Sequence, residues 1–403
     1  MTHTPIYLDN ASTTWPKPPE VADAMADFIR TGCASPGRGG YRMAVRSAEY
    51  VSRLRSHLSR MMNAPATERV VITPGATDST TMAIMGLFAH LPKPTKPMRV
   101  VSTVLEHNAV RRPLYLLDQM GIIEWVQVPC DNDGLMRTED VLAHVNESTV
   151  LVSMMMASNG VGTLLPALEV CRALKDTRPE VLTLVDASQT MGVIPIDVQA
   201  DNIDMLLFPG HKALMGPTGI GVLYLSERAT GETPVSTGLR VEPTRLGGTG
   251  GDSGKDSMPT KMPARYEVGT HNTVACVGLL AAIEADGYPK GHDALAHERA
   301  MCKRIIDHLT DHPKVRIVGT HDVSNRVGVV AISAEDWAPG DLAAALDAEA
   351  GICVRSGFLC APGAHKALDT FATGGTVRMS PGVYTTDAEI DVLLKTLDTL
   401  ITR

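Results

Sequence analysis

Two side chains with complementary chemistry follow two apolar segments near the middle of the 403-residue chain. The apolar segment 181–185 is followed at once by Asp186, and the apolar segment 205–208 is followed closely by His211 and Lys212. A lysine amine forms a Schiff base with an aldehyde, and a carboxylate keeps a pyridine nitrogen protonated so that the ring accepts electrons. The pair therefore indicates pyridoxal 5′-phosphate (PLP) chemistry.

The end of another apolar segment, 69–73, offers a place for a phosphate. Ala76 and Thr77 open a helical pattern directly after Pro74 and Gly75. Small residues at a helix start let backbone N–H groups approach an anion, and the helix dipole favours negative charge there. A plain capped turn between a strand and a helix is the alternative for this motif on its own.

Polar side chains follow further segments and extend the pattern. His107, just beyond the segment 99–103, can stack on a flat ring or move a proton. Asn159 and Gln189 can each offer an amide to a ring oxygen. A structural histidine, a turn and a helix cap are the respective alternatives, but together these residues favour one flat, phosphorylated ligand. A nicotinamide site is excluded, because no Gly-x-Gly-x-x-Gly with an acidic residue about 20 positions later follows the first strand.

The elements that must position these residues predict an α/β fold. The expected strands are 69–73, 99–103, 123–128, 149–154, 181–186, 205–208 and 221–225. The expected helices between them include 78–91, 109–120 and 165–174. Strands that alternate with helices form a mainly parallel sheet covered on both faces, and ligands bind at the carboxyl ends of its strands. Asp186 and Lys212 fall at such ends.

The last third of the chain predicts a second, smaller α+β domain. Its pattern contains helices at 273–285, 293–309, 339–350 and after Thr386, strands at 316–319 and 327–332, and a strand into Arg355. We expect a large cofactor-binding domain at 18–270, and a small domain formed by 1–17 together with 271–403. A glycine-rich segment at 246–263 is typical of a long loop with a functional or interface role.

The composition is that of an ordinary globular protein, with 44% hydrophobic residues, 20% charged residues and a net charge of −8. An acidic balance disfavours nucleic acid or an anionic membrane as a partner. No apolar run approaches the roughly 20 residues of a membrane helix. The N-terminus lacks the pattern of a secretory signal.

The seven cysteines are scattered and odd in number: Cys33, Cys130, Cys171, Cys276, Cys302, Cys353 and Cys360. They form no Cys-x-x-Cys pair and histidines do not cluster at zinc spacing, so we expect no bound metal. Free thiols in a reducing cytoplasm are the expected state. Six of the cysteines are expected to be small buried hydrophobic residues, and Cys360 is the exception.

A set of short motifs runs through nearly the whole chain. They are Tyr7-Leu-Asp-Asn-Ala-Ser-Thr-Thr14, Gly75-Ala-Thr77, Glu106-His107-Asn108, Asn159-x-x-Gly162-Thr163, Asp186-Ala-x-Gln189, Gly210-His211-Lys212, Glu267-x-Gly269-Thr270-x-Asn272, Val354-Arg355-x-Gly357-x-x-Cys360-Ala361 and Thr376-Val-Arg378-x-Ser380. Their order and type resemble the fold-type I PLP enzymes of the class V aminotransferase group, and specifically the NifS/SufS-like cysteine desulfurases. The resemblance implies a seven-stranded, mainly parallel sheet with a smaller α+β domain.

The resemblance also implies how PLP is held. Lys212 binds it covalently and moves protons, Asp186 pairs with the pyridine N–H, and His107 stacks over the ring. Further cofactor contacts are implied for Ala76, Thr77, Asn159, Gln189, His211 and Thr270. Thr270 would come from the partner subunit of a homodimer.

Three residues are implied to act on the substrate, L-cysteine. Arg378 and Arg355, aided by Asn159, would bind its carboxylate, for which the planar fork of arginine is well suited. The products implied are L-alanine and an enzyme persulfide.

Cys360 matches the family's nucleophilic cysteine, whose thiolate attacks the substrate sulfur and keeps it as a persulfide. Nearby cationic groups such as Arg355 favour the thiolate. An inert buried thiol is the alternative, but the flanking Ser-Gly-Phe-Leu and Ala-Pro-Gly are typical of a loop. Four residues separate Arg355 from Cys360, as in the short-loop, SufS-like type, which often passes sulfur to a partner protein or a small thiol.

Departures from the family pattern leave other reactions open. Pro209 replaces a serine that bonds the phosphate in relatives, at a cost of roughly 1 kcal/mol, and His365 is expected to be an exposed loop histidine. Selenocysteine lysis, C–S β-elimination from cysteine or cystine, and transamination are the alternative activities. An inactive scaffold is a further alternative, against which the complete set of Lys212, Asp186, His107 and Cys360 argues.

Overall fold

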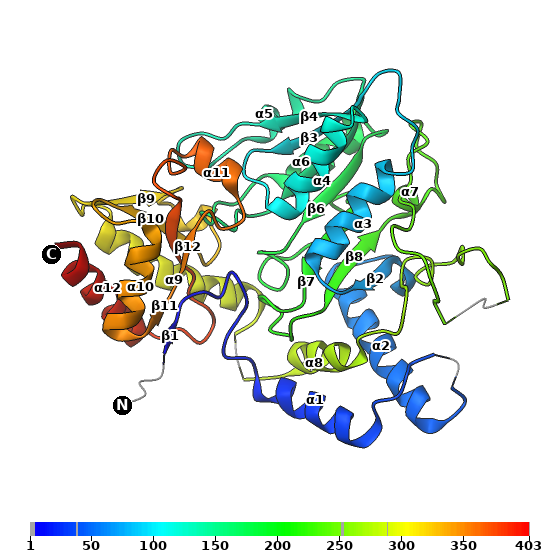
Figure 1. Cartoon of the computed structure of the whole chain (residues 1–403), viewed down its shortest axis with the longest axis horizontal. Coiled ribbons are helices and arrows are strands. Elements are labelled where there is room, and N and C mark those ends of the chain that lie inside the picture. The colour runs from blue at the N-terminus through cyan, green and yellow to red at the C-terminus, as the bar shows by residue number, and fades with distance from the viewer. Residues whose placement is uncertain (1–4, 38, 251–253, 288, 403) are drawn as a thin grey trace.

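The computed structural model describes residues 5–37, 39–250, 254–287 and 289–402, so part of the predicted loop at 246–263 lies outside the described residues. Its centre is a seven-stranded sheet with the order β2-β8-β7-β6-β5-β3-β4 (Figure 1). The strands are β2 (Val70–Thr73), β3 (Met98–Thr103), β4 (Ile123–Val128), β5 (Thr149–Met155), β6 (Leu182–Asp186), β7 (Met205–Pro209) and β8 (Gly221–Leu225). Among these seven, β8 runs antiparallel to both of its neighbours and the other pairs are parallel. The predicted mainly parallel sheet is confirmed.

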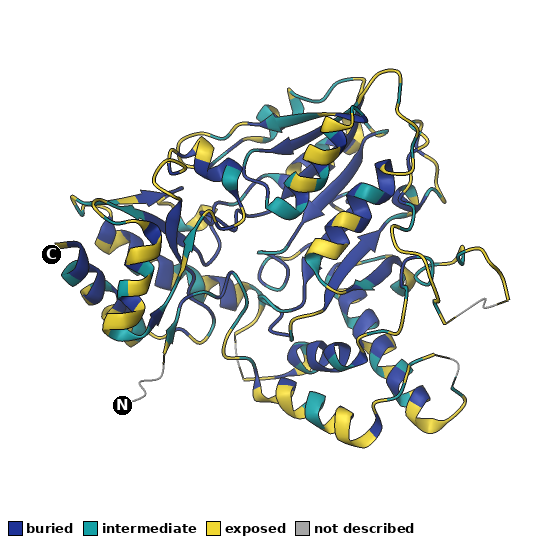
Figure 2. Cartoon of the chain, viewed as in Figure 1, coloured by how far each residue is buried: buried dark blue, intermediate teal, exposed yellow. Residues whose placement is uncertain are grey.

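Successive residues of these strands face opposite layers of helices. On one face, Val71, Leu151 and Leu207 share a core with α3 (Ala76–Phe88) and α4 (Asn108–Gln119). On the other face, Val70, Val152 and Leu206 share a core with the helices α2 (Arg42–Met61), α6 (Ala167–Thr177) and α8 (Thr273–Glu284). A strand that is apolar on both sides belongs in a sheet covered on both faces. In Figure 2 most of these strands are accordingly dark blue, and they lie between helices whose outer sides are yellow.

A second, four-stranded antiparallel sheet has the order β12-β13-β10-β9. Its strands are β9 (Val315–Val318), β10 (Val330–Ala334), β12 (Arg355–Gly357) and β13 (Thr376–Met379), and its apolar residues pack on α9 (Gly291–Leu309), α10 (Pro339–Ala350) and α12 (Asp387–Thr402). The sequence pattern did not predict β13 or the short helix α11 (Pro362–Ala367). The remaining helices are α1 (Pro19–Gly32), α5 (Thr138–Leu142) and α7 (Glu227–Thr230), with 3₁₀ turns at Thr67–Arg69 and Val323–Asn325.

The first described residues join this second sheet region to the large sheet. β1 (Ile6–Tyr7) pairs in parallel with β11 (Ile352–Cys353), and Leu8 is buried in the core of α9, α10 and α12. Further along, Thr13 and Thr14 donate hydrogen bonds to the carbonyl oxygen of His211 at 3.1 and 3.2 Å. We call residues 5–17 the N-terminal strap.

The packing bears on how the chain divides into domains. α8 lies on the large sheet with α2, whereas α9 begins the helical layer of the second sheet. The strap contributes Leu8 to that second core. We propose a boundary between α8 and α9, which assigns α8 to the large domain rather than to the small domain expected at 271–403, with the strap belonging to the smaller domain.

Two general features can be compared with expectation. In the described part of the chain, the helices that are long enough to cross a membrane are not apolar enough to do so. The seven cysteines are free thiols, of which Cys171, Cys276 and Cys302 are buried as predicted. The prediction is wrong for Cys33, which is exposed because it follows the surface helix α1, and Cys130 and Cys353 are only half-buried.

Candidate active site

A cleft of about 1010 Å³ opens where the carboxyl ends of the large sheet's strands face the second sheet. It is lined by Ala76, Thr77, His107, Asn159, Asp186, Gln189, His211, Lys212, Arg355, Cys360 and Arg378. Of the site residues predicted from the sequence, Thr270 is the one that lies elsewhere.

Asp186 and Lys212 reach the cleft because two adjacent parallel strands end side by side. Asp186 is the last residue of β6 and stands opposite Leu207 of β7, and Lys212 follows the end of β7. Asp186 Oδ1 accepts a hydrogen bond from the Ser188 backbone N–H at 2.8 Å, which orients the carboxylate. Gln189 Nε2 donates to the Ala11 carbonyl oxygen at 3.1 Å, so the strap also touches this edge of the sheet.

The surroundings of Lys212 make its amine easier to deprotonate. Burial lowers the pKa of Lys212 to about 8, although the nearby Asp186 carboxylate opposes the shift. Its backbone carbonyl oxygen accepts a hydrogen bond from Thr14 Oγ1 at 3.1 Å. An amine with a pKa close to neutral has a larger uncharged fraction than an exposed lysine, and the uncharged amine is the form that attacks an aldehyde.

His107 directly precedes α4, and its ring caps the N-terminus of this helix. Its Nδ1 accepts the Ala109 backbone N–H at 3.0 Å. In the neutral ring the proton is therefore assigned to Nε2. Burial lowers the pKa of His107, with a further lowering from Lys212 and an opposing effect of Asp186. The ring is thus held in one orientation and favours the uncharged form.

Glu106 was part of a predicted motif but was given no role. It is fully buried, and its Oε1 accepts hydrogen bonds from Thr103 Oγ1 at 2.9 Å and from the Met155 backbone N–H at 3.1 Å. Burial raises the pKa of Glu106 to about 8. The carboxyl links the ends of β3 and β5, from which His107 and Asn159 follow, so it supports the floor of the cleft.

The start of α3 forms an open anion site. No side chain caps this helix, and Ala76 and Thr77 of its first turn line the cleft. The turn at Gly75 lies directly on β8, where a Cβ atom at Gly221 would come within 2.5 Å of the Gly75 carbonyl carbon. Glycine at 221 is what lets this turn approach the sheet, and the helix dipole and free N–H groups suit a phosphate.

Cys360 stands at the mouth of the cleft, on the short loop between β12 and α11. It is exposed. Both Leu359 and Cys360 have a positive φ, of 51° and 56°, a conformation that non-glycine residues adopt only when the surroundings hold them there. Two hydrogen bonds do so: the Asn108 N–H donates to the Cys360 carbonyl oxygen at 2.7 Å, and Asn159 Nδ2 donates to the Leu359 carbonyl oxygen at 2.6 Å.

Arg378, in the centre of β13, is buried and already engaged. Its Nη2 donates to Asp9 Oδ1 and to Ser12 Oγ, both at 2.7 Å, and its Nη1 donates to the Asn159 carbonyl oxygen at 2.8 Å. Its Nε is buried without a hydrogen-bond partner among the residues described. Arg355 stands opposite Arg378 in the β12–β13 register. Asp9 and Ser12 were not predicted as site residues, and only the Tyr7–Thr14 motif pointed to this segment.

The residues present fit PLP. Lys212 and Asp186 stand at neighbouring strand ends, and the first turn of α3 supplies a free anion site in the same cleft. In the described structure His211 Nδ1 and Asn159 Oδ1 are buried in the cleft wall without hydrogen-bond partners. Burial, together with Lys212 and Lys17, lowers the pKa of His211 to about 4. Buried polar atoms without partners are rare unless a ligand or water completes them.

One predicted feature, the exposure of His365, differs in the structure. His365 is buried rather than exposed, because α11 packs against the end of β3 and its ring Nδ1 lies 2.7 Å from Thr370 Oγ1. Its ring also contacts Phe358 edge-on, with the centroids 5.7 Å apart. Among the described residues, no group of His, Cys, Asp and Glu side chains is arranged to hold a metal ion.

Thr270 lines a separate groove of about 690 Å³ with Arg55 and His271. A buried network shapes this region: Arg55 Nη1 and Nη2 bind the two oxygens of Glu267 at 2.7 and 2.9 Å, and His271 Nε2 lies 2.8 Å from Glu267 Oε2. Burial would raise the pKa of Glu267, but His271 and Arg55 hold it at about 2. The turn that carries Thr270 is therefore fixed at the surface of the large domain.

Comparisons with known proteins agree with this geometry. The family model for aminotransferase class-V matches residues 6–393. The chain is 33% identical over 98% of its length to a probable cysteine desulfurase of Methanothermobacter thermautotrophicus, covering 94% of that protein, and 30% identical over 98% of its length to one of Streptomyces coelicolor, covering 92%. Among solved structures, a cysteine desulfurase from Thermococcus onnurineus superposes with a TM-score of 0.85 at 26% identity, over 99% of this chain and 95% of that one. The chain belongs to the aminotransferase class-V family.

Proposed function

We propose that the protein is a PLP-dependent cysteine desulfurase that converts L-cysteine to L-alanine and leaves a persulfide on Cys360. The observation that carries the proposal is one cleft lined both by an exposed thiol, Cys360, and by the Lys212–Asp186 pair. The names of the similar proteins from Methanothermobacter and Streptomyces support the same activity. The enzyme would act in the cytoplasm, where free thiols persist.

PLP, when bound, would supply an electron sink for the bonds at the substrate's α- and β-carbons. Lys212 would hold it and would take and return protons at those carbons. Asp186 would pair with the pyridine nitrogen, and Gln189 and Asn159 would lie beside the ring oxygen. Ala76, Thr77 and His211 would meet the phosphate.

His107 and the two arginines would handle the substrate. The ring of His107 would cover one face of the cofactor, and its Nε2–H is free to donate. Three of the five N–H groups of Arg378 already bind Asp9, Ser12 and the Asn159 carbonyl oxygen, so its Nε–H and the second N–H of Nη1 would be left for the substrate carboxylate. Arg355, beside it in the sheet, would add the second positive charge.

The sulfur step moves one atom between two thiols. The Cys360 thiolate attacks the substrate sulfur, an S–S bond forms, and the Cβ–S bond breaks with its electron pair staying on carbon. That carbon takes a proton, which gives alanine, and no outside oxidant is needed. A small thiol or a protein acceptor later removes the sulfur from the persulfide and restores the Cys360 thiol.

A homodimer would complete the site. Thr270 lies on the surface outside its own cleft, beside a groove lined by Gly248 and Gly250. Thr270 does not line its own cleft, so a phosphate that it contacts would belong to a second copy. We therefore propose that the groove is an interface, and a monomeric mass in solution for an active enzyme would overturn this part.

The test of the activity is an assay of L-cysteine with a reductant, in which alanine, sulfide and pyruvate are measured for the wild type and for Cys360→Ala. We expect alanine without pyruvate from the wild type, and a fall of roughly a hundredfold in the variant, because the nucleophile is lost. Cys33→Ala, which removes another exposed thiol far from the cleft, should keep full activity. Pyruvate as the main product, or an equally active Cys360→Ala, would contradict the proposal.

A further inference from the structure

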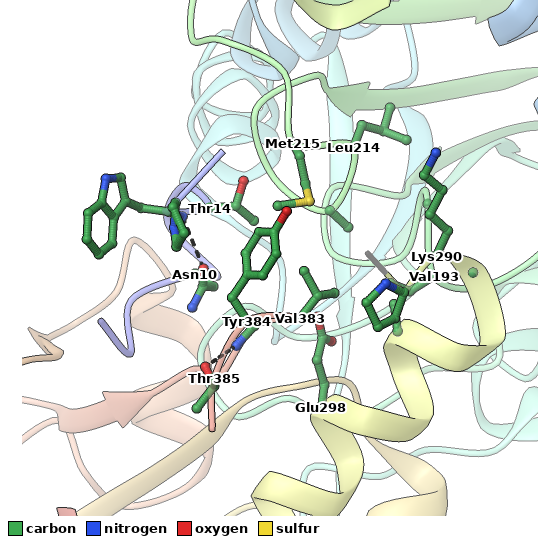
Figure 3. Close-up of a pocket in the computed structure, with 18 of the residues that line it drawn as sticks. Asn10, Thr14, Val193, Leu214, Met215, Lys290, Glu298, Val383, Tyr384 and Thr385 are labelled. Carbon is green, nitrogen blue, oxygen red and sulfur yellow. Dashed lines mark hydrogen bonds between the residues drawn. The ribbon is translucent and has the colours of Figure 1, made fainter. Parts of the chain in front are cut away.

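A second cavity lies behind the loop that carries Lys212. It has a volume of about 250 Å³ and is bounded by the N-terminal strap, the segment 213–215, the start of α9 and the segment 382–385 (Figure 3). Its apolar wall is formed by Val193, Leu214, Met215, Ile283, Ala294 and Val383. The proposed function does not use this cavity, whose lining shares no residue with the substrate cleft.

One carboxyl faces this apolar space. Glu298, on α9, points toward the cavity in Figure 3 and lines it. No hydrogen bond or ion pair joins its carboxyl to any other residue of the described chain. Burial alone raises the pKa of Glu298 to about 8. The backbone makes room for the group, because a Cβ atom at Gly328 would lie 2.6 Å from Glu298 Oε2.

The other charged side chains at the cavity already form hydrogen bonds within the chain. The Lys290 amine donates to the carbonyl oxygens of Ile283 and Ala285, at the end of α8. Glu389 Oε2 accepts the Thr386 backbone N–H at 2.7 Å. The Glu298 carboxyl thus differs from both, because within the described chain it is paired with neither a cation nor a hydrogen-bond donor. An isolated carboxyl in an apolar environment is costly unless a partner arrives.

The cavity is also close to the cofactor lysine. A smaller space of about 30 Å³, enough for about one water molecule, is lined by Glu298, Gln189 and Lys212. The segment 213–215, directly after Lys212, forms a wall of the larger cavity. A molecule in the cavity would therefore press on the loop that carries Lys212 from its rear side.

We propose that this cavity binds a small amphipathic cation, namely a protonated amine on an apolar body of about one ring, with Glu298 as its counter-ion. The wall supplies apolar contact, and the carboxyl supplies the charge that the amine needs. An engineered apolar cavity of about 150 Å³ holds benzene, so the volume here has room for a ring and a short amine-bearing arm.

The experiment is a calorimetric titration of the PLP-loaded enzyme with N,N-dimethylbenzylamine. A tertiary amine cannot condense with the cofactor aldehyde, so its heat reports binding outside that chemistry. We expect a dissociation constant in the millimolar range or below. Benzyl methyl ether, a neutral molecule of nearly the same shape, should bind at least about tenfold more weakly.

Two variants locate the site. Glu298→Gln should weaken the amine at least about tenfold while leaving the ether unchanged, whereas Glu389→Gln, at the rim of the same cavity, should bind the amine as the wild type does. Ala294→Leu should fill the space and abolish binding of both probes. Absence of measurable binding to the wild type, equal affinity for amine and ether, or unchanged affinity in a folded Glu298→Gln would each overturn the proposal. If Ala294→Leu does not fold, the Glu298→Gln comparison decides alone.

Discussion

The two walls of the active cleft are built in different ways. On the wall formed by the large sheet, Asp186 and Lys212 follow buried neighbouring strands, so the ladder between β6 and β7 fixes their spacing. On the opposite wall, Cys360 sits on a short loop with left-handed backbone, and Arg378 lies in a four-stranded antiparallel sheet. The first wall is set by its own strands, whereas the second is positioned by hydrogen bonds that cross the cleft.

Those crossing bonds are few and specific. Asn108 and Asn159, from the sheet wall, hold the carbonyl oxygens of Cys360 and Leu359. Arg378 Nη1 donates to the Asn159 carbonyl oxygen across the cleft, and within its own wall Arg378 is held by Asp9 of the strap. Cofactor binding and substrate handling are therefore separable. Damage to the sheet wall should remove both, whereas damage to a bond that holds the opposite wall should impair substrate handling and spare cofactor binding.

The largest effect is expected for Lys212→Ala. Loss of the amine should abolish the borohydride-fixed cofactor adduct and lower kcat by about a thousandfold or more, because covalent and proton-transfer roles are lost together. The measurement is absorbance and peptide mass after reduction, with kcat from alanine release.

Lys17→Ala is the matched control for this change, since Lys17 is also partly buried and its amine donates to the His211 carbonyl oxygen at 3.3 Å. It should retain the adduct and most of the activity. If the cofactor adduct persists on another residue in Lys212→Ala, Lys212 is not the residue that holds the cofactor, and the role given to the sheet wall is wrong.

A smaller effect is expected for Asp9→Asn, which weakens the ion pair that positions Arg378 on the second wall. Arg378 and Asp9 are largely buried, with the Nη2–Oδ1 distance at 2.7 Å. The variant should raise KM for L-cysteine by about tenfold, as a buried charge-assisted hydrogen bond of 1.5–3 kcal/mol is weakened. The dissociation constant of PLP should stay within twofold of the wild type.

Asp27→Asn, which removes an exposed partner of Arg46, should change neither quantity. If Asp9→Asn lowers cofactor affinity as strongly as it raises KM, the walls are not separable in the way described.

A last effect, of about the same size, concerns pH and tests the sheet wall alone. The uncharged amine captures PLP, and the pKa of Lys212 is lowered to about 8. The amine is therefore mostly charged below that pH and mostly free above it. The rate of PLP capture by the apoprotein should rise by about tenfold from pH 7 to pH 9 and then level off. A stopped-flow titration checks this, with free N-acetyl-lysine as the reference; a rate that climbs through pH 10 as the reference does would contradict the shift.

The sequence predicted the sheet wall well for a physical reason. β6 and β7 are mostly apolar and fully buried. A polar residue at or just after the end of such a strand lies at the carboxyl edge of the sheet, whatever the register between strands. Asp186, Lys212 and His107 could therefore be placed in one cleft from the pattern alone. The second wall offered weaker signals: β12 and α11 have only 3 and 6 residues, too few to show a period.

What could not be predicted rests on contacts between distant parts of the chain. Asp9 and Arg378 are 369 positions apart, and neither belongs to a pattern that names the other. The burial of His365 follows from the docking of α11, where a Cβ at Gly363 would clash with the Val104 carbonyl oxygen. Glu106 shares this difficulty, because only the fold shows that its carboxyl is enclosed.

The N-terminal strap has a consequence for how the protein is made. The Ala11 backbone N–H donates to the Ser380 hydroxyl, 369 positions further along. A ribosome that has released the strap must still synthesise nearly all of the chain before this partner emerges. The large sheet can fold during translation, as domains generally do. The active cleft, however, is complete only after β13 has left the exit tunnel. A segment that is synthesised early is thus among the last to dock, and a premature stop before residue 380 would leave a folded sheet without a working enzyme.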